Sequence, residues 1–201
     1  MAKRKSFEKI LNTEFRWPKI GDLPFVMAAD PLSNASIAND SSARLLAMTD
    51  GYRRAADLLV KQAESNDADR DFLVYPIIFN YRHFLELSLK YLLATHGPRV
   101  GIEPNWKTHD LLVLWEEFYD MLQRFGTNDP DEVDPIVAST VLEFAKIDPG
   151  SYSHRYPVDC FGKPLPVTHA DLHLATLADV INGVSGYFSG TDGFLSDLVN
   201  P

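Results

Sequence analysis

The sequence predicts an all-α fold, an up-and-down bundle of about five helices preceded by an extended N-terminal arm. Apolar residues recur at three- and four-residue spacing along most of the chain, as on the buried face of an amphipathic helix. Segments rich in Pro, Gly and Asp separate these stretches, and none has the pattern of a persuasive β-strand. We therefore expect an arm over residues 1–40, one helical bundle over residues 41–190 and a C-terminal tail over residues 191–201.

The expected arm begins with a basic run, MAKRK, and contains prolines that interrupt any helix at Pro18, Pro24 and Pro31. Residues 33–42 are small and polar. We interpret the basic start as a frayed, solvated terminus. An arm that contacts nucleic acid is the alternative interpretation.

The first two helices are expected over residues 42–66 and 71–96. The first has an apolar stripe typical of an amphipathic helix. In the second, apolar residues surround the whole circumference, which predicts a central helix that is buried on most sides. Pro76 lies within this second segment, so the helix either begins near it or is kinked there.

Three further helices are expected over residues 108–125, 129–147 and 168–188. Thr108 is a plausible N-cap for the first of them, and Gly126 follows it as a stop signal. Asp129-Pro130 has the N-cap residue and the proline that open many helices. Thr168-x-x-Asp171 approximates a capping box for the last helix.

Polar residues on the central helix are confined to one sector. Arg82, His83, Glu86 and Lys90 fall within roughly 100° of each other at about 100° per residue. The spacing of Arg82, Glu86 and Lys90 lets the carboxylate pair with a cation on either side. One interpretation is an internal ion ladder at a polar seam. The other is a functional cluster, because charges on a central helix need a partner or a task.

Charge is unevenly distributed along the chain. Residues 1–19 contain six basic and two acidic residues, a net charge of +4, whereas the remainder contains 13 basic and 26 acidic residues, a net charge of −13. An acidic body argues against a broad nucleic-acid-binding surface, although a local site remains open. Cys160 is the only cysteine, which excludes a disulfide framework and a cysteine zinc site. No apolar run approaches 18 residues, so we expect no membrane association and a cytoplasmic location.

Three short motifs, in this order, resemble the HEPN family of small helical-bundle domains. The first is ELSLK, from Glu86 to Lys90, and the second is THDL, from Thr108 to Leu111. The third is RYP, from Arg155 to Pro157, followed two residues later by Asp159. The resemblance covers roughly residues 42–188 and leaves out the N-terminal arm. It implies an up-and-down helical bundle that forms a homodimer, usually in prokaryotic defence or toxin–antitoxin systems.

Many members of that family are metal-independent ribonucleases with an Arg-x4–6-His motif. No His follows any Arg of this chain at that spacing, and Arg82 and His83 are adjacent. A metal-free ribonuclease needs a general base and a cation against the phosphate. The candidates for such catalysis by a different arrangement are Arg82, His83 and Glu86, with Arg155 as a further cation.

Other polar residues allow two interpretations each. His109 at a helix start either caps and packs the helix or belongs to the site. Arg155 and Asp159 either form an ion pair that stabilises the loop or present Arg155 to a phosphate. His169 and His173 have metal-pair spacing but no third ligand placed by sequence, so we expect surface histidines and neither a metal nor a cofactor. The candidate binding residues are Arg82, His83, Glu86, Lys90, His109, Arg155 and Asp159.

Three functional hypotheses follow from these observations. The preferred one is a non-catalytic HEPN-like protein that binds a protein partner, a nucleotide or RNA. The second is a ribonuclease built on the unusual Arg and His residues. The third is a structural dimerisation module with the polar sector sealed in its core. The exposure of the polar sector distinguishes these hypotheses, because a ligand can reach only side chains that line an open surface.

Overall fold

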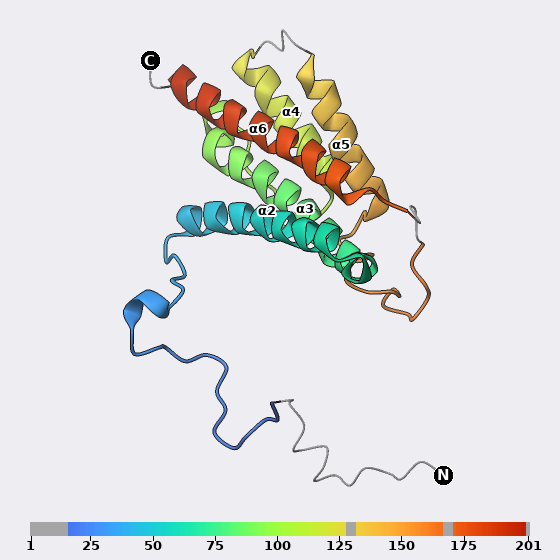
Figure 1. Ribbon diagram of the computed structural model, residues 1–201. Coiled ribbons are helices and arrows are strands. Elements are labelled where there is room, and N and C mark those ends of the chain that lie inside the picture. Colours follow the sequence, from blue (N-terminus) through green and yellow to red (C-terminus); the bar gives the residue numbers. More distant parts are fainter. Residues whose placement is uncertain (1–15, 128–131, 167–170, 200–201) are drawn as a thin grey trace, which may run out of the picture. The chain divides into compact units, whose positions relative to one another are not determined.

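The computed structural model describes residues 16–127, 132–166 and 171–199, and it confirms the all-α fold over these ranges. The chain divides into two compact units, Met1–Ile37 and Ala38–Pro201, close to the boundary expected at residue 40. The described residues contain five α-helices and two short 3-10 helices (Figure 1). Their only β-type pairing is an isolated bridge between Val158 and Pro164.

The described part of the first unit is held together by short-range hydrogen bonds. The 3-10 helix η1 (Pro31–Ser33) is capped by the Asp30 side chain, which accepts from the Leu32 N–H. The Asn34 side chain donates to the Ala28 carbonyl and accepts from its N–H. Large apolar side chains of this unit are exposed, at Trp17, Ile20, Leu23, Phe25, Val26, Met27, Leu32 and Ile37.

The second unit begins with a helical hairpin, α2 (Ser41–Ser65) and α3 (Asp67–His96). Asp40 caps α2 by accepting from the Ala43 N–H, and Asn66 separates the helices and caps α3 through the Ala68 N–H. The α2 bounds agree with the expected 42–66 range within one residue. Helix α3 begins at Asp67 and continues through Pro76, so a start near Pro76 is wrong.

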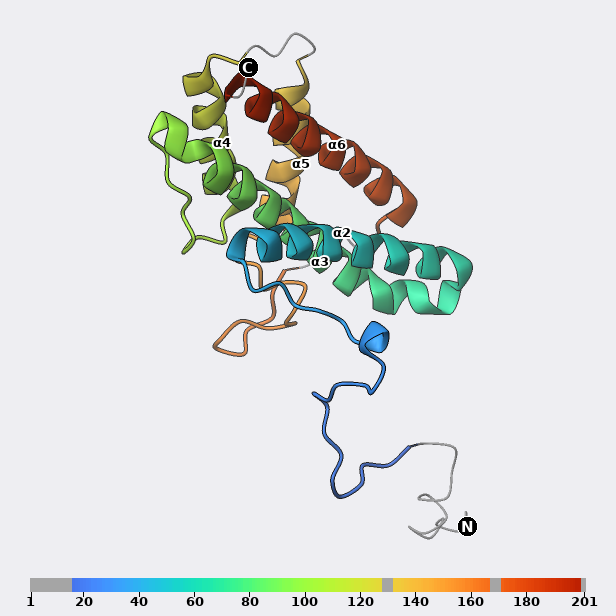
Figure 2. The same cartoon turned by 90° about the vertical axis from the view of Figure 1, so that its left-hand side faces the viewer.

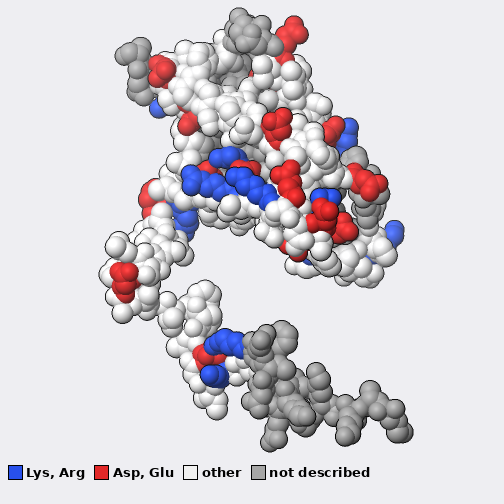
Figure 3. Space-filling model, in the orientation of Figure 1, with Lys and Arg blue, Asp and Glu red and all other residues white. Residues whose placement is uncertain are grey.

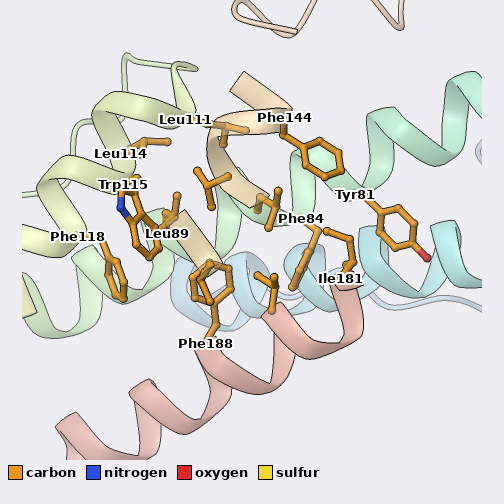
Figure 4. Close-up of a cluster of buried hydrophobic side chains, with 14 of the residues drawn as sticks. Tyr81, Phe84, Leu89, Leu111, Leu114, Trp115, Phe118, Phe144, Ile181 and Phe188 are labelled. Carbon is orange, nitrogen blue, oxygen red and sulfur yellow. The ribbon is translucent and has the colours of Figure 1, made fainter. Parts of the chain in front are cut away.

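As expected, α3 is the central helix: fourteen of its residues are buried, more than in any other described helix. Helices α4, α5 and α6 lie on one side of the α2–α3 hairpin (Figures 1 and 2). Apolar side chains from α3, α4, α5 and α6 meet in one core, which includes Phe84, Phe118, Phe144 and Phe188 (Figure 4).

A short 3-10 helix, η2 (Gly97–Val100), follows α3, and α4 spans Leu111–Phe125. Its N-cap is Asp110, whose side chain accepts from the Leu112 N–H, so the cap expected at Thr108 lies two residues too early. The Thr108 hydroxyl instead accepts from the Asp110 N–H. Gly126 ends α4 with a φ of 69°, as its stop signal predicted.

Helix α5 (Val133–Ile147) ends where expected. The start predicted at Asp129-Pro130 falls outside the described residues, and the first described helical residue is Val133.

Helix α6 spans Leu174–Val199, so the tail expected over residues 191–201 is wrong as far as Val199. Thr168, the first residue of the predicted capping box, lies outside the described residues. His173 precedes the helix instead, and its Nδ1 accepts from the Thr176 N–H. No described helix combines the length and apolar character needed to cross a membrane.

Candidate functional site

The polar sector of α3 is a buried ion ladder. Lys90 Nζ lies 2.9 Å from Glu86 Oε1, and Arg82 NH1 lies 3.1 Å from Glu86 Oε2. The Arg82 side chain is 0% exposed, and those of Glu86 and Lys90 are also buried. The i, i+4, i+8 spacing therefore pairs the charges as the sequence suggested, and it does so inside the protein.

Glu86 also binds His109, which arrives just before α4. His109 Nδ1 lies 2.8 Å from Glu86 Oε1, while the His109 side chain remains 61% exposed. Burial alone would raise the pKa of the Glu86 carboxyl, but the hydrogen bonds from Lys90 and His109 outweigh it and lower the pKa. Glu86 is thus a charged group that connects the buried ladder to an exposed imidazole.

Arg82 connects α3 to two segments that are distant in sequence. Its Nε donates to the Asp148 carbonyl at 2.9 Å, and its NH2 donates to the His109 carbonyl at 2.6 Å. The first contact is at the end of α5 and the second at the start of α4. Because Arg82 is buried and uses its donors in this way, its role in the structure is to position these segments.

Asp148 organises the loop after α5. Its Oδ1 accepts from the N–H groups of Tyr152 and Ser153, and its Oδ2 lies 3.7 Å from Arg82 Nε and 3.8 Å from His154 Nδ1. Burial tends to raise the pKa of Asp148. The neighbouring His154 imidazole, the two N–H groups and the Arg82 guanidinium outweigh that effect and lower the pKa to about 2. We call Arg82, Glu86, Lys90, His109 and Asp148 the Glu86 network.

The low pKa of Asp148 predicts a loss of stability in acid. Its ordinary pKa is 3.8 and its folded value is about 2, so the unfolded chain binds the proton first as the pH falls. The stabilisation is complete above about pH 5 and is lost as the pH falls toward 2; it amounts to roughly 2 kcal/mol. Urea unfolding of wild type and Asp148→Asn should therefore differ more at pH 7 than near pH 2.5. An equal difference at both values would contradict this role for Asp148.

The loop that Asp148 holds presents Arg155 on the surface. The Arg155 guanidinium carbon lies 5.6 Å from the ring centre of Phe79, 5.3 Å from that of Tyr152 and 5.9 Å from that of Tyr156. Its Nε donates to the Ser151 carbonyl. Arg155 has no ion-pair partner among the described residues, and these distances are typical of cation–π contacts.

His83 continues the aromatic surface along α3. Its ring stacks on Phe79 with centres 5.7 Å apart and meets the edge of Tyr52 at 4.4 Å. Burial, together with the nearby Arg82 and Lys90, lowers the pKa of His83 despite the opposing effect of Glu86, so the ring is neutral at pH 7. The side chain remains 21% exposed. We call the rings of Tyr52, Phe79, His83, Tyr152 and Tyr156, with Arg155, the aromatic face.

The three motifs that resemble the HEPN family converge in space. Glu86 and Lys90 bind each other, Glu86 binds His109 from the second motif, and Arg155 from the third lies over Phe79 of the same helix. Asp159 does not join them, because its Oδ1 accepts from the N–H groups of Phe161 and Lys163 in its own turn. No ion pair joins Arg155 and Asp159, so the first of the two interpretations given for these residues is wrong.

The structure shows no metal site at His173 within the described part of the chain. His173 caps α6, and His169 lies outside the described residues. No group of three or more His, Cys, Asp or Glu side chains with metal-binding geometry occurs within residues 16–127, 132–166 and 171–199.

Sequence reasoning missed Asp148, Phe79, Tyr52 and Tyr152. Asp148 directly follows the helix expected to end at residue 147, and its position four residues before Tyr152 is compatible with a capping turn. The helical pattern alone does not distinguish these aromatic residues from residues of the core. Phe79 precedes Arg82 and His83 by three and four residues, about one helical turn, and only this spacing could have indicated that it lies in their angular sector.

No protein-family model, no curated protein and no solved structure matches this chain.

Proposed function

We propose that this chain is an HEPN-like, non-catalytic protein that binds a nucleotide or the end of a single-stranded RNA on the aromatic face. The observation that supports this most directly is the exposed Arg155 guanidinium, placed over three rings without an ion-pair partner among the described residues. A base can stack on exposed rings, and the guanidinium N–H groups can donate to a phosphate. Prokaryotic defence is the setting that the resemblance suggests.

The charge of the body limits the kind of binding. The net charge of −13 outside residues 1–19 disfavours a long phosphate track, whereas one exposed arginine suits one or two phosphates. For single strands, the logarithm of affinity falls with the logarithm of salt by about 0.7 for each phosphate contacted. A shallow salt dependence, corresponding to one or two phosphates, is therefore part of the proposal.

Replacing Arg155 by alanine is expected to weaken RNA binding by about 10- to 100-fold. This range follows from about 1–3 kcal/mol for each stacked base and charged contact. Fluorescence anisotropy with a labelled eight-nucleotide RNA measures the affinity, and competition with unlabelled adenosine monophosphate separates nucleotide from RNA binding. Arg155→Lys keeps the charge but loses the planar stack, so it should recover only part of the affinity.

The matched control is Arg124→Ala, which removes an exposed arginine that pairs with Asp120 on α4. It should bind as wild type does. Equal binding by wild type and Arg155→Ala would contradict the proposed site. Circular dichroism and unfolding curves of each variant exclude loss of folding as the cause.

The ribonuclease alternative is supported by one feature, the contact between Glu86 and His109. A carboxylate that binds Nδ1 can orient an imidazole so that Nε2 acts as a base, and His109 is exposed. In this reading His109 takes a proton from the ribose hydroxyl and Arg155 binds the phosphate. Denaturing gels of the same RNA would show cleavage that disappears in His109→Ala, and that result would replace the non-catalytic proposal.

The proposal includes a homodimer. It is supported by the apolar side chains that α2 and the first part of α3 leave exposed, among them Leu58, Phe72 and Tyr75. Sedimentation of the free chain in the binding buffer gives its mass. A monomer at high micromolar concentration would remove the dimer from the proposal without affecting the Arg155 site.

A further inference from the structure

A cavity of about 330 Å³ lies between α2, α3 and α6. Ser88 and Tyr91 line it from α3, and they project about 180° to 240° around the helix from Arg82. The cavity is therefore on the opposite side of α3 from the Glu86 network. Its volume is near the lower end of those that hold small organic ligands.

Asp192 is a polar group of this cavity with two partners on α3. Its Oδ1 lies 2.7 Å from His96 Nε2, and its Oδ2 accepts from the Tyr91 hydroxyl at 3.2 Å. Burial, with the Asp192 charge, raises the pKa of Tyr91, which keeps the hydroxyl protonated as a donor. The Asp192 side chain is still 32% exposed, so it can accept further hydrogen bonds from a ligand.

The partners of Asp192 leave its negative charge available. His96 is buried and its Nδ1 has no hydrogen-bond partner among the described residues. A neutral ring that donates from Nε2 leaves only a lone pair unsatisfied at Nδ1, whereas a protonated ring would bury an N–H without an acceptor. No Lys or Arg pairs with Asp192 among the described residues.

The remaining wall combines aromatic surface with a cation that is already paired. Phe84 and Phe188 line the cavity on the α3 and α6 sides. Arg53 lines it from α2, but its guanidinium binds Asp50 at 3.3 Å and Asp57 at 3.2 Å. Figure 3 shows Lys and Arg side chains next to Asp and Glu side chains over the region of α2. The wall therefore offers rings together with more acidic than basic charge.

We propose that this cavity binds a small organic ammonium ion with an apolar group, the ammonium donating to Asp192 and the apolar group lying against Phe84 and Phe188. The Asp192 carboxylate favours an ammonium ion over a neutral alcohol or an acid, and the rings favour the apolar group. The net charge of −13 outside residues 1–19 also attracts cations to this body. The proposal is independent of the nucleotide site on the other side of α3.

The test is a titration of the full chain with 2-phenylethylammonium, followed by the amide signals in nitrogen–proton correlation spectra. 2-Phenylethanol and 3-phenylpropionate are the neutral and anionic controls of similar shape. We expect saturable shifts at amides lining the cavity and at least tenfold weaker binding of both controls. Equal binding of the alcohol, or no saturable shift up to about 20 mM ammonium, would overturn the proposal, since millimolar affinity is the weakest binding that a formed site implies.

Two variants connect binding to the cavity. Asp192→Asn keeps an oxygen for hydrogen bonding but removes the charge, and it should weaken ammonium binding at least tenfold. If Asp192→Asn does not fold, Ser185→Trp fills the same cavity from α6 and should abolish the shifts. Asp179→Asn, an exposed change on α6 away from the cavity, is the control and should bind as wild type does. Undiminished binding by a folded Asp192→Asn or Ser185→Trp would contradict the assignment.

Discussion

Replacing Glu86 by alanine is expected to lower the free energy of unfolding by about 3–5 kcal/mol. The carboxylate is buried and pairs with Lys90, Arg82 and His109. Its removal leaves the buried Lys90 without an anion, and it leaves Arg82 only the Asp148 carboxylate, 3.7 Å from its Nε. Urea denaturation at pH 7, followed by circular dichroism, measures the change.

Two further variants separate charge from shape. Glu86→Gln keeps the volume and one acceptor oxygen, so its loss should be smaller than that of Glu86→Ala but still exceed 1 kcal/mol. Glu143→Ala makes the same change on the exposed side of α5, and its effect should stay within about 0.5 kcal/mol. A loss below about 1 kcal/mol for Glu86→Ala would mean that solvent screens the pair, contrary to the burial described here.

Helical periodicity predicted which charges pair but could not predict how deep they lie. The spacing of Arg82, Glu86 and Lys90 places them on one side of a helix whatever covers that side. Their burial depends on the segments around His109 and Asp148, which come from other parts of the chain. The structure combines the two interpretations of the sector, because the ladder is buried while His109 and Arg155 are exposed beside it.

Expectations based on residues close in sequence were wrong where a contact between distant residues determines the structure. Arg155 and Asp159 are close enough in sequence to suggest an ion pair, but Asp159 binds N–H groups of its own turn and Arg155 lies over Phe79. The contact with Phe79 spans 76 positions and has no local signal. Arg82 reaches the Asp148 carbonyl across 66 positions in the same way.

The end of α6 shows how tertiary packing overrides propensity. Gly190 and Gly193, at the start of the expected tail, disfavour a helix. The segment is nevertheless helical to Val199, because Leu195 is fully buried and Asp192 binds His96 and Tyr91 of α3. These contacts compensate for the cost of two glycines, which is about 1 kcal/mol each.

Arg82 connects the stability of the bundle to the proposed binding surface. Its guanidinium holds the end of α5 at Asp148, and Asp148 in turn holds the N–H groups of Tyr152 and Ser153. Tyr152 and Arg155 both belong to the aromatic face. Replacing Arg82 should therefore weaken RNA or nucleotide binding, although Arg82 itself does not contact the ligand.

Replacing Arg82 by methionine is expected to lower the free energy of unfolding by about 3–5 kcal/mol, because the carbonyls of Asp148 and His109 and the Glu86 carboxylate lose a buried donor. Methionine fills most of the volume, so the lost hydrogen bonds dominate the effect. Urea denaturation measures it, and Arg70→Met, an exposed change at the start of the same helix, should cost less than about 1 kcal/mol.

The same variant tests the connection to the surface. Under conditions where Arg82→Met remains folded, hydrogen exchange at the Tyr152 and Ser153 amides should be faster than in wild type, because Asp148 loses the group that positions it. RNA binding should weaken along with this loss of protection, while Arg70→Met should keep both. If Arg82→Met is destabilised but leaves the exchange of these two amides and the RNA affinity unchanged, Arg82 supports the bundle alone and the loop that carries Arg155 is positioned by other contacts.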